Sequence, residues 1–244
     1  MGQTPAGPNW TGGQPCAYHP AAFGKGAKAG INGVQVAIEE FSYFRSDDPC
    51  DLSYPAEGNP WSRPYEYKWA LDRSLAEKGR NGPGRPTQAL NAAWGFSGCH
   101  VAFRERLDES FEAIHTDAFI DARFIPIQIQ AYNRYPTFIQ DITQGYKGFL
   151  NKFDVVMCVS VLEHLPMPLA KAAIANFVSY ARVGGAVLIT FDIPSESGAM
   201  IVAAYGGGRL PDGSPALLDG NTSRLPNPDC AGLNVGRLLL RRLS

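Results

Sequence analysis

The pattern of hydrophobic positions alternates between short continuous runs and helical spacings along the middle of the chain. The clearest run is Phe153–Val161, a near-continuous apolar stretch of the kind found in strands buried on both faces. Four shorter runs predict further strands, at Ala89–Ala93, Phe111–Ile114, Thr137–Ile142 and Ala186–Ile193. The sequence therefore predicts five strands that form a sheet.

Helical spacing appears between and after these runs. Apolar residues recur on one side of Tyr65–Lys78, Val101–Leu107 and Leu169–Ala181, and Ser195–Tyr205 is also interpreted as a helix. Val183–Gly185 is expected to form a turn before the last strand. Alternating strands and helices predict an α/β fold: a Rossmann-like, doubly wound, mostly parallel sheet with helices on both faces.

The two ends of the chain show weaker patterns and divide it into three segments. We interpret residues 1–58 as an N-terminal arm, partly extended or disordered, 59–200 as the core, and 201–244 as a loop-rich C-terminal segment. Val34–Phe44 is the first stretch able to join a core; its β-branched and aromatic residues favour a strand, with a helix as a close alternative. Leu233–Leu243 is expected to close the sheet as an edge strand.

Composition bears on the partners and the location expected for the protein. The 244 residues are 45% hydrophobic and carry 22 Lys and Arg against 23 Asp and Glu, a net charge of −1 that does not favour a nucleic acid or an anionic membrane as partner. Arg237, Arg241 and Arg242 are interpreted as a solvated strand end. Five cysteines without metal or redox spacing fit a reducing, cytoplasmic location. The chain lacks an apolar run of the roughly 20 residues that a membrane span needs.

Candidate chemistry is sought where the strands end, because ligands of open parallel sheets bind beyond the carboxyl ends of the strands. The first strand runs into Asn91–Gly98 (NAAWGFSG), whose small residues would let a ligand approach the backbone. The helix start that follows would suit a carboxylate or phosphate. An ordinary β–α turn with Trp94 packed in the core is the alternative.

Polar residues also follow the next three strands. Asp117 follows the second strand and could bond the hydroxyls of a ribose, or cap a helix. Asp141 and Ile142 end the third strand and could bond and cover an adenine, although Asp141 taken alone is better explained as a cap. Ser160–Pro166 (SVLEHLP) follows the fourth strand and is the most specific of these segments.

The segment FDVVMCVSVLEHLP, from Phe153 to Pro166, resembles the fourth-strand motif of the class I S-adenosylmethionine-dependent methyltransferases, a Rossmann-like family. The resemblance extends over about Arg63 to Pro194. Ser62–Trp69 resembles the aromatic, Glu-containing helix that precedes the family's first motif, and Ala89–Gly98 resembles that motif itself. Asp117 stands where the family has an acid after the second strand, and Asp141–Ile142 resembles the third-strand motif. Arg182–Pro194 resembles the Gly-Gly turn and the fifth strand.

This resemblance implies S-adenosylmethionine as the cofactor, with residues 59–200 forming the part that binds it. The cofactor's carboxylate would lie at the turn after the first strand, its ribose at Asp117 and its adenine at Asp141. The first motif is degenerate, because Asn91 replaces its acid. The implied cofactor-binding residues are Asn91, Ala93, Gly95, Ser97, Gly98, Asp117, Asp141, Ile142 and Ser160, of which Ala93 and Ser97 stand where the family has glycines.

The implied reaction is methyl transfer to a small-molecule or sugar-like acceptor by in-line displacement. A sulfonium methyl is already activated, so the protein mainly positions the acceptor against it. His164 is the candidate base, since an imidazole accepts a proton near neutral pH, and Glu163 beside it is the second catalytic candidate. The alternative is that both residues only tie the loop to its neighbours. No metal is expected, because His19, His100 and His115 lack ligand spacing.

Two other functions stay open from the sequence. A catalytically inactive binding or structural protein that keeps the methyltransferase fold would explain Asn91, Ala93 and the short region after Pro194. A nicotinamide-dependent dehydrogenase would need a Gly-x-Gly-x-x-Gly turn, of which Ala93–Gly98 supplies only the last two glycines. The sequence identifies neither the acceptor atom nor the oligomeric state.

Overall fold

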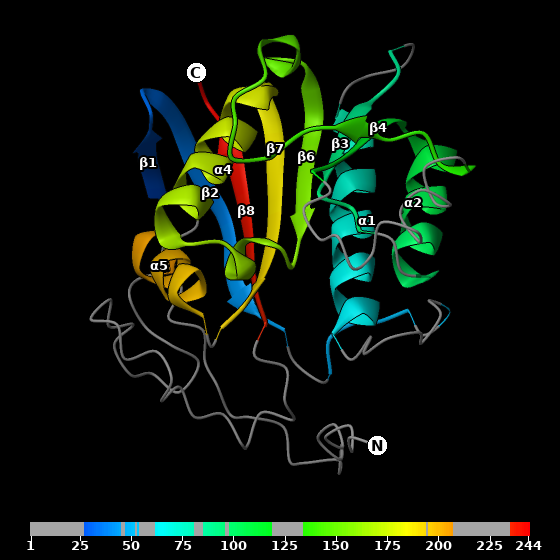
Figure 1. Ribbon diagram of the computed structural model, residues 1–244, viewed down its shortest axis with the longest axis horizontal. Coiled ribbons are helices and arrows are strands. Elements are labelled where there is room, and N and C mark those ends of the chain that lie inside the picture. Colours follow the sequence, from blue (N-terminus) through cyan, green and yellow to red (C-terminus); the bar gives the residue numbers. More distant parts are fainter. Residues whose placement is uncertain are drawn as a thin grey trace.

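A single mixed sheet of eight strands forms the centre of the protein (Figure 1). The computed structural model describes residues 27–44, 47–51, 53, 62–80, 85–95, 98–118, 134–193, 195–206 and 235–244. The strand order is β1-β2-β8-β7-β6-β3-β4-β5. The strands are β1 (Ala27–Ile31), β2 (Val34–Tyr43), β3 (Gln88–Ala92), β4 (Glu112–Asp117), β5 (Phe138–Ile139), β6 (Phe153–Val159), β7 (Ala181–Asp192) and β8 (Val235–Arg242).

The five strands predicted from the central sequence run parallel to one another. Their spatial order, β5-β4-β3-β6-β7, corresponds to third, second, first, fourth and fifth of the five along the chain. This is the order of a doubly wound sheet, in which the strand order reverses beside the first strand. The prediction of a Rossmann-like, mostly parallel α/β fold is therefore confirmed.

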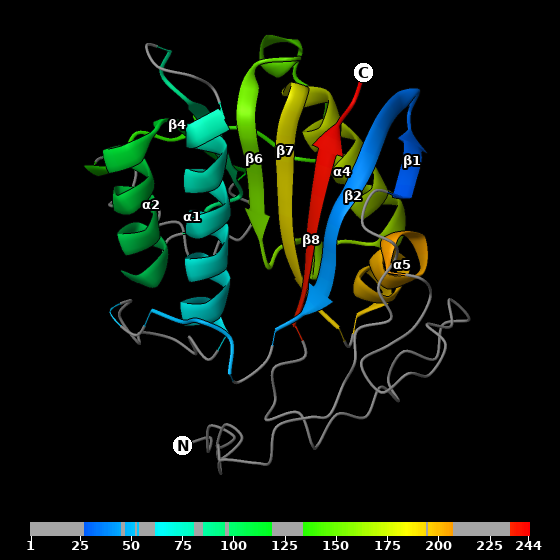
Figure 2. The same ribbon diagram turned by 180° about the vertical axis from the view of Figure 1, so that it is seen from behind.

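Helices cover both faces of the sheet, as Figures 1 and 2 show from opposite sides. The helices α1 (Arg63–Arg80) and α2 (Gly98–Ser110) lie on one face, and α4 (Met167–Tyr180) and α5 (Glu196–Tyr205) lie on the other; η1 (Lys147–Phe149) and η2 (Leu162–His164) are single 3₁₀ turns. Each face has its own apolar cluster, around Trp69 and Phe103 on the first and Phe177 and Ile201 on the second. None of the described helices combines the length and the apolar character needed to span a membrane.

The predicted elements agree with this architecture apart from two local differences. The third strand is shorter than Thr137–Ile142, because β5 lies at the sheet edge and its side chains are exposed, 68% in the case of Ile139. The turn expected at Val183–Gly185 is a bulge within β7. Phe153 of β6 pairs with Ala181, whereas Val155, two residues later, pairs with Ala186, so β7 has extra residues between the two pairs.

The N-terminal segment contributes an antiparallel hairpin to the sheet. β2 confirms the strand expected at Val34–Phe44 and pairs with β1 through a two-residue turn, Asn32-Gly33, in which both residues have positive φ. β2 also pairs with β8, so β8 lies inside the sheet. The strand expected at Leu233–Leu243 is thus confirmed, but its assignment to the sheet edge is wrong, because β2 covers its outer side.

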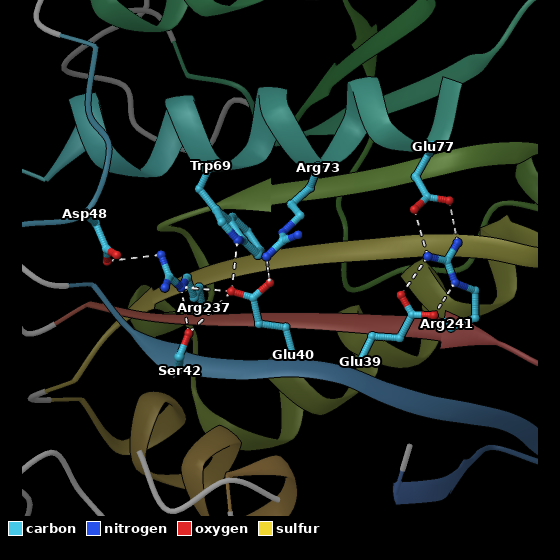
Figure 3. A network of polar contacts seen from close by, with 9 residues as sticks. All are labelled: Glu39, Glu40, Ser42, Asp48, Trp69, Arg73, Glu77, Arg237 and Arg241. Atoms are coloured by element: carbon cyan, nitrogen blue, oxygen red, sulfur yellow. Dashed lines mark hydrogen bonds and ion pairs between the residues drawn. The ribbon is translucent and has the colours of Figure 1, made fainter. Parts of the chain in front are cut away.

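Two arginines of β8 belong to an ion-pair network drawn in Figure 3, here called the arginine network. Arg241 bonds Glu39 of β2 (Nη2–Oε2 2.7 Å) and Glu77 of α1 (Nη1–Oε2 2.5 Å). Arg237 bonds Glu40 (Nε–Oε1 3.0 Å) and Asp48 (Nη1–Oδ2 3.1 Å). The network also includes Ser42, Trp69 and Arg73.

These contacts correct the interpretation of Arg237, Arg241 and Arg242 as a solvated strand end. Arg241 is only 7% exposed, because β2 and α1 enclose it and supply its carboxylate partners. Arg242 donates from Nη1 to the backbone oxygens of Ser179 (3.0 Å) and Ala181. The arginines therefore join β8 to its neighbours.

The helix expected at Ser195–Tyr205 is confirmed as α5, and Ser195 caps it by accepting a hydrogen bond from the N–H of Gly198 at 2.9 Å. Residues 1–26 of the expected N-terminal arm and 207–228 of the expected C-terminal loop lie outside the described residues.

Candidate functional site

Four predicted site residues lie where neighbouring parallel strands end. Gly95 follows β3, Asp117 ends β4, Asp141 follows β5 and Ser160 follows β6. Because β5, β4, β3 and β6 are adjacent and parallel, their carboxyl ends share one edge of the sheet. A hydrogen bond joins two of these residues directly, from the Gly95 N–H to Asp117 Oδ2 at 3.1 Å. The structure thus brings these predicted positions to a common edge.

The turn after β3 is tightly constrained. Gly95 has a φ of +72°, and a Cβ at this position would lie 2.3 Å from His100 Nδ1 of α2, so the turn requires glycine. Ala93 also adopts a positive φ, +54°, which costs an L-residue roughly 1–2 kcal/mol. Gly98 begins α2, and Ser97 lies outside the described residues. The backbone therefore makes the turn of a first motif although alanine replaces its first glycine.

The side chain of Asn91 contacts the neighbouring strand β4. It is buried in β3, and its Nδ2 lies 3.2 Å from His115 Nδ1 of β4. The other ring nitrogen of His115, Nε2, lies 2.8 Å from Asp108 Oδ1 of α2. The Asn91 amide thus links β3 to β4 and α2, and its contact with a cofactor stays a prediction.

Asp141 and Ile142 have local roles in the structure. Oδ1 of Asp141 accepts hydrogen bonds from the N–H and the hydroxyl of Thr143, at 2.8 and 2.7 Å, so this residue caps a local turn. Ile142 is buried in the apolar cluster beneath α4, and its backbone oxygen accepts a bond from Asn176 of that helix at 2.9 Å. Contact of either residue with an adenine stays a prediction.

α1 carries a buried carboxylate that the sequence analysis did not single out. Glu66 is fully buried and accepts hydrogen bonds from the hydroxyls of Ser160 (2.5 Å to Oε2) and Thr190. Its Oε1 bonds Nη1 of Arg63 at 2.7 Å. Burial by itself would raise the pKa of Glu66, but Arg63 and the neighbouring hydroxyls lower it below its ordinary value, so the carboxylate is ionised.

Two further carboxyl groups lie beyond β6 and β7. Both oxygens of Glu163, in η2, are buried and form no hydrogen bond to another of the described residues, and the same holds for Oδ1 of Asp192 at the end of β7. Burial, with the charges of Asp192 and Glu66, raises the pKa of Glu163 to about 8. Burial and the charge of Glu66 raise the pKa of Asp192 to about 6. At neutral pH Glu163 therefore holds a proton and Asp192 is mostly ionised.

Two histidines lie near these groups in different states. His164 is exposed, and its pKa is lowered by partial burial and by the charge of Arg63. His100, beside Gly95, has a pKa lowered to about 3 by burial and then by Arg63, so its ring is neutral. His164 remains available as a base, whereas His100 shapes the turn after β3.

Comparison with known proteins gives weak structural similarities. No protein-family model and no curated protein sequence matches the chain. The solved structures that it resembles include CalS10, an amino pentose methyltransferase from Micromonospora echinaspora with S-adenosylmethionine bound, at 20% identity and a TM-score of 0.41, covering 56% of this chain and 53% of that one. DesVI from Streptomyces venezuelae matches at 21% identity and a TM-score of 0.41, covering 57% and 54%.

A third solved structure, the DszA carbon methyltransferase, matches at 15% identity and a TM-score of 0.47, covering 77% of this chain and 56% of that one. The chain thus spans about half the length of each of these structures. The fold of this chain is established by its own strand order: a doubly wound, mostly parallel α/β sheet.

Proposed function

We propose that this protein transfers a methyl group from S-adenosylmethionine to a small-molecule or sugar-like acceptor by in-line displacement. The observation that carries the proposal is the common edge at which Gly95, Asp117, Asp141 and Ser160 lie, one at each carboxyl end of four adjacent strands. Doubly wound sheets bind nucleoside-containing ligands at this edge, beside the first strand.

The residues at the edge fit such a cofactor. Asp117 follows the second parallel strand, where an acid commonly bonds the hydroxyls of a ribose. Arg63 is partly exposed, and a guanidinium suits the carboxylate of the cofactor. The ionised carboxylate of Asp192 gives the region a negative charge suited to a cation, and Glu163 adds a second one when it ionises.

The bound cofactor would supply an activated methyl group, and the protein would orient the acceptor and take up its proton. His164 and Glu163 are the candidate proton acceptors. His164 is exposed and neutral at pH 7, while Glu163 accepts a proton only after it has ionised, because its pKa is about 8. We further propose a cytoplasmic location without nucleic-acid or membrane partners, on the grounds of the net charge of −1 and the cysteine usage.

A second candidate function is ligand binding without transfer. It is favoured by the first turn, where Asn91 stands in place of an acid and bonds His115, and Ala93 adopts a glycine-like conformation. Loss of a carboxylate that would hold the cofactor's ammonium group would weaken binding. Such a protein would bind cofactor or its demethylated product without turnover.

Calorimetry with S-adenosylmethionine, S-adenosylhomocysteine and NAD tests the proposal. We expect the first two ligands to bind and NAD not to bind. Asp117→Ala should weaken binding of both by about ten-fold or more, because a charged hydrogen-bond acceptor is lost. The matched control Asp72→Ala removes an exposed carboxylate paired with Lys68 on α1 and should leave affinity unchanged.

Absence of binding at millimolar ligand would reject the proposed function, and binding of NAD alone would favour the dehydrogenase. Binding of the first two ligands without methyl transfer to a panel of small acceptors would favour the non-catalytic candidate. A His164→Ala variant that keeps full turnover and normal cofactor affinity would remove His164 from the mechanism.

A further inference from the structure

The ends of β6 and β7 carry more buried negative groups than positive ones. Glu66, Glu163 and Asp192 meet here, and Arg63 is the cation whose charge acts on all three. Arg63 forms its ion pair with Glu66 (2.7 Å). Neither Glu163 nor Asp192 has a comparable partner among the described residues. A buried carboxylate without a partner is costly, so a missing cation is the simplest completion of this arrangement.

Glu66 is itself fully satisfied, which separates it from the other two acids. Besides Arg63, it accepts the hydroxyls of Ser160 and Thr190. By contrast, both Glu163 oxygens are inaccessible to solvent and find no hydrogen-bond partner in other residues that the structure describes, and the same holds for Oδ1 of Asp192. The two unsatisfied groups come from neighbouring elements, η2 and the end of β7, and the charge of Asp192 acts on Glu163, so we treat them as a pair.

The strand order places this pair on the acceptor side of the site, a step that rests on the proposed function. The cofactor's adenine and ribose are expected at β5 and β4, and its amino-acid end at the turn after β3. Glu163 and Asp192 follow β6 and β7, which lie beyond β3 in the opposite direction. A cofactor extended in this way would point its transferable methyl toward the pair.

We propose that Glu163 and Asp192 form an acceptor subsite for a protonated primary or secondary amine. The ammonium group binds between the two carboxylates and then gives one proton to Glu163. The nitrogen lone pair forms the bond to the methyl carbon while the carbon–sulfur bond breaks and its electron pair goes to sulfur. The products are a methylated ammonium and a neutral thioether.

Binding of the amine should depend on pH through this pair. Arg63 and Glu66 from α1 act on both acids through their charges, and Cys158 from β6 is close enough to Glu163 for the charge of that acid to raise its pKa. Helix α5, which also packs on η2, contributes Ser197, whose hydroxyl donates to the Leu165 oxygen at 2.5 Å. Glu163 must ionise to bind a cation well, so affinity should rise between pH 6 and pH 8.

Methylammonium is the probe, because it carries the proposed group and little else. Its binding to the full chain without cofactor is followed by NMR line broadening of the labelled methyl group at pH 6 and pH 8, with methanol as the uncharged comparison. We expect methylammonium to bind more tightly at pH 8, and methanol not to bind. Glu163→Gln should weaken the binding by about ten-fold or more.

Two variants keep this test independent of folding defects. Asp192→Asn should give a similar loss by removing the partner acid, and Glu109→Gln, which neutralises an exposed acid on α2, should change nothing. Methylammonium binding that survives both substitutions at the pair, or that equals methanol binding, overturns the subsite.

The cofactor titration separates this inference from the proposed function. If S-adenosylmethionine binds and methylammonium does not, the subsite is wrong while the proposed function stands. If the two compete, the carboxylates hold the cofactor's own cationic end, which also overturns the acceptor subsite. If methylammonium binds as expected and S-adenosylmethionine does not, the cation site stands without the transferase.

Discussion

Two groups of buried carboxylates in this protein differ in how their charge is balanced. In the arginine network, the side chains of Arg241 and Glu77 are 8% and 7% exposed, and the Arg241 guanidinium bonds both Glu77 and Glu39. At the ends of β6 and β7, Glu163 and Asp192 keep buried oxygens that bond no other residue in the described part of the chain. The first group joins β8, β2 and α1, and the second lies where ligands of such sheets bind.

This difference distinguishes buried charges that hold the fold together, as in the arginine network, from buried charges that await a ligand, as we propose for Glu163 and Asp192. The arginine network shows that this chain can surround a buried carboxylate with guanidinium donors where only cohesion is needed. The unsatisfied pair lies within range of Arg63, yet Arg63 bonds Glu66 instead. Buried polar groups are otherwise almost always bonded, so the exceptions point to a ligand that completes them. Substitutions in the two groups should therefore have opposite effects on stability.

The largest effect is expected for Arg241→Ala. This substitution leaves the exposed Arg80 as the remaining cation of Glu39 (4.0 Å) and Glu77 (3.6 Å). Breaking a buried pair costs about 3–5 kcal/mol, and Arg80 should offset part of that loss. Urea unfolding should show a lower midpoint with an unchanged slope. A loss below about 1 kcal/mol would mean that the network contributes little to holding β8, β2 and α1 together.

The next effect is a gain in stability from Glu163→Gln. The pKa of Glu163 rises from its ordinary 4.5 to about 8 on folding, so the folded protein must hold a proton that the unfolded chain releases. Its contribution is therefore neutral below about pH 4.5 and becomes increasingly unfavourable as the pH rises to about 8. Glutamine removes this penalty, and we expect a gain on the order of 2–3 kcal/mol at pH 8.

Thermal unfolding at pH 5 and pH 8 checks this expectation. The two proteins should differ little at pH 5 and clearly at pH 8, with the variant the more stable. A variant that is less stable than the parent at pH 8 would show that the Glu163 carboxylate is bonded in solution, and the contrast with the arginine network would disappear.

A smaller loss is expected for Ser160→Ala, which tests the satisfied acid within the site. The Ser160 hydroxyl donates to Glu66 at 2.5 Å, and Glu66 would keep its bonds to Arg63 and Thr190. Removing one hydrogen bond to a buried charged group should cost about 1.5–3 kcal/mol at most, and less where other donors remain. Urea unfolding at pH 7 measures this loss of stability. An unchanged free energy of unfolding would show that the Ser160 hydroxyl does not stabilise the Glu66 carboxylate.

The smallest effect is expected at the outer end of the arginine network. Arg73 is 47% exposed and bonds Glu40, which also has Arg237 and Trp69 as partners. Exposed ion pairs contribute about 0–1 kcal/mol, so Arg73→Ala should barely change the unfolding midpoint. It is the matched control for Arg241→Ala, and equal losses in the two variants would show that burial does not decide the effect.

Much of the fold follows from local pattern. The continuous apolar run at β6 and the helical spacing of α1 and α4 were sufficient to predict these elements, because both reflect burial of neighbouring residues. The strand-end rule then brought Gly95, Asp117, Asp141 and Ser160 to one edge. These are properties that short stretches of sequence encode.

Other features depend on pairings that no short stretch records. The internal position of β8 is decided by its pairing with β2, and Arg241 is buried for the same reason. Glu66 lies three residues after Arg63, a spacing that also suits an exposed helical ion pair, and only the packing of α1 over β6 and β7 buries it. Glu163 was a candidate from its place beside His164, but its lack of partners emerges only from the three-dimensional structure.

The pairing of β2 with β8 also has a consequence for biosynthesis. Glu39 and Arg241, which join these strands, are 202 residues apart, so the ribosome completes β2 about 10–40 s before β8. During that time the hairpin of β1 and β2 has no third strand, and such a hairpin is only marginally stable in water. The nascent chain therefore exposes unpaired strand edges until β8 has been synthesised, and chaperones would protect them during that interval.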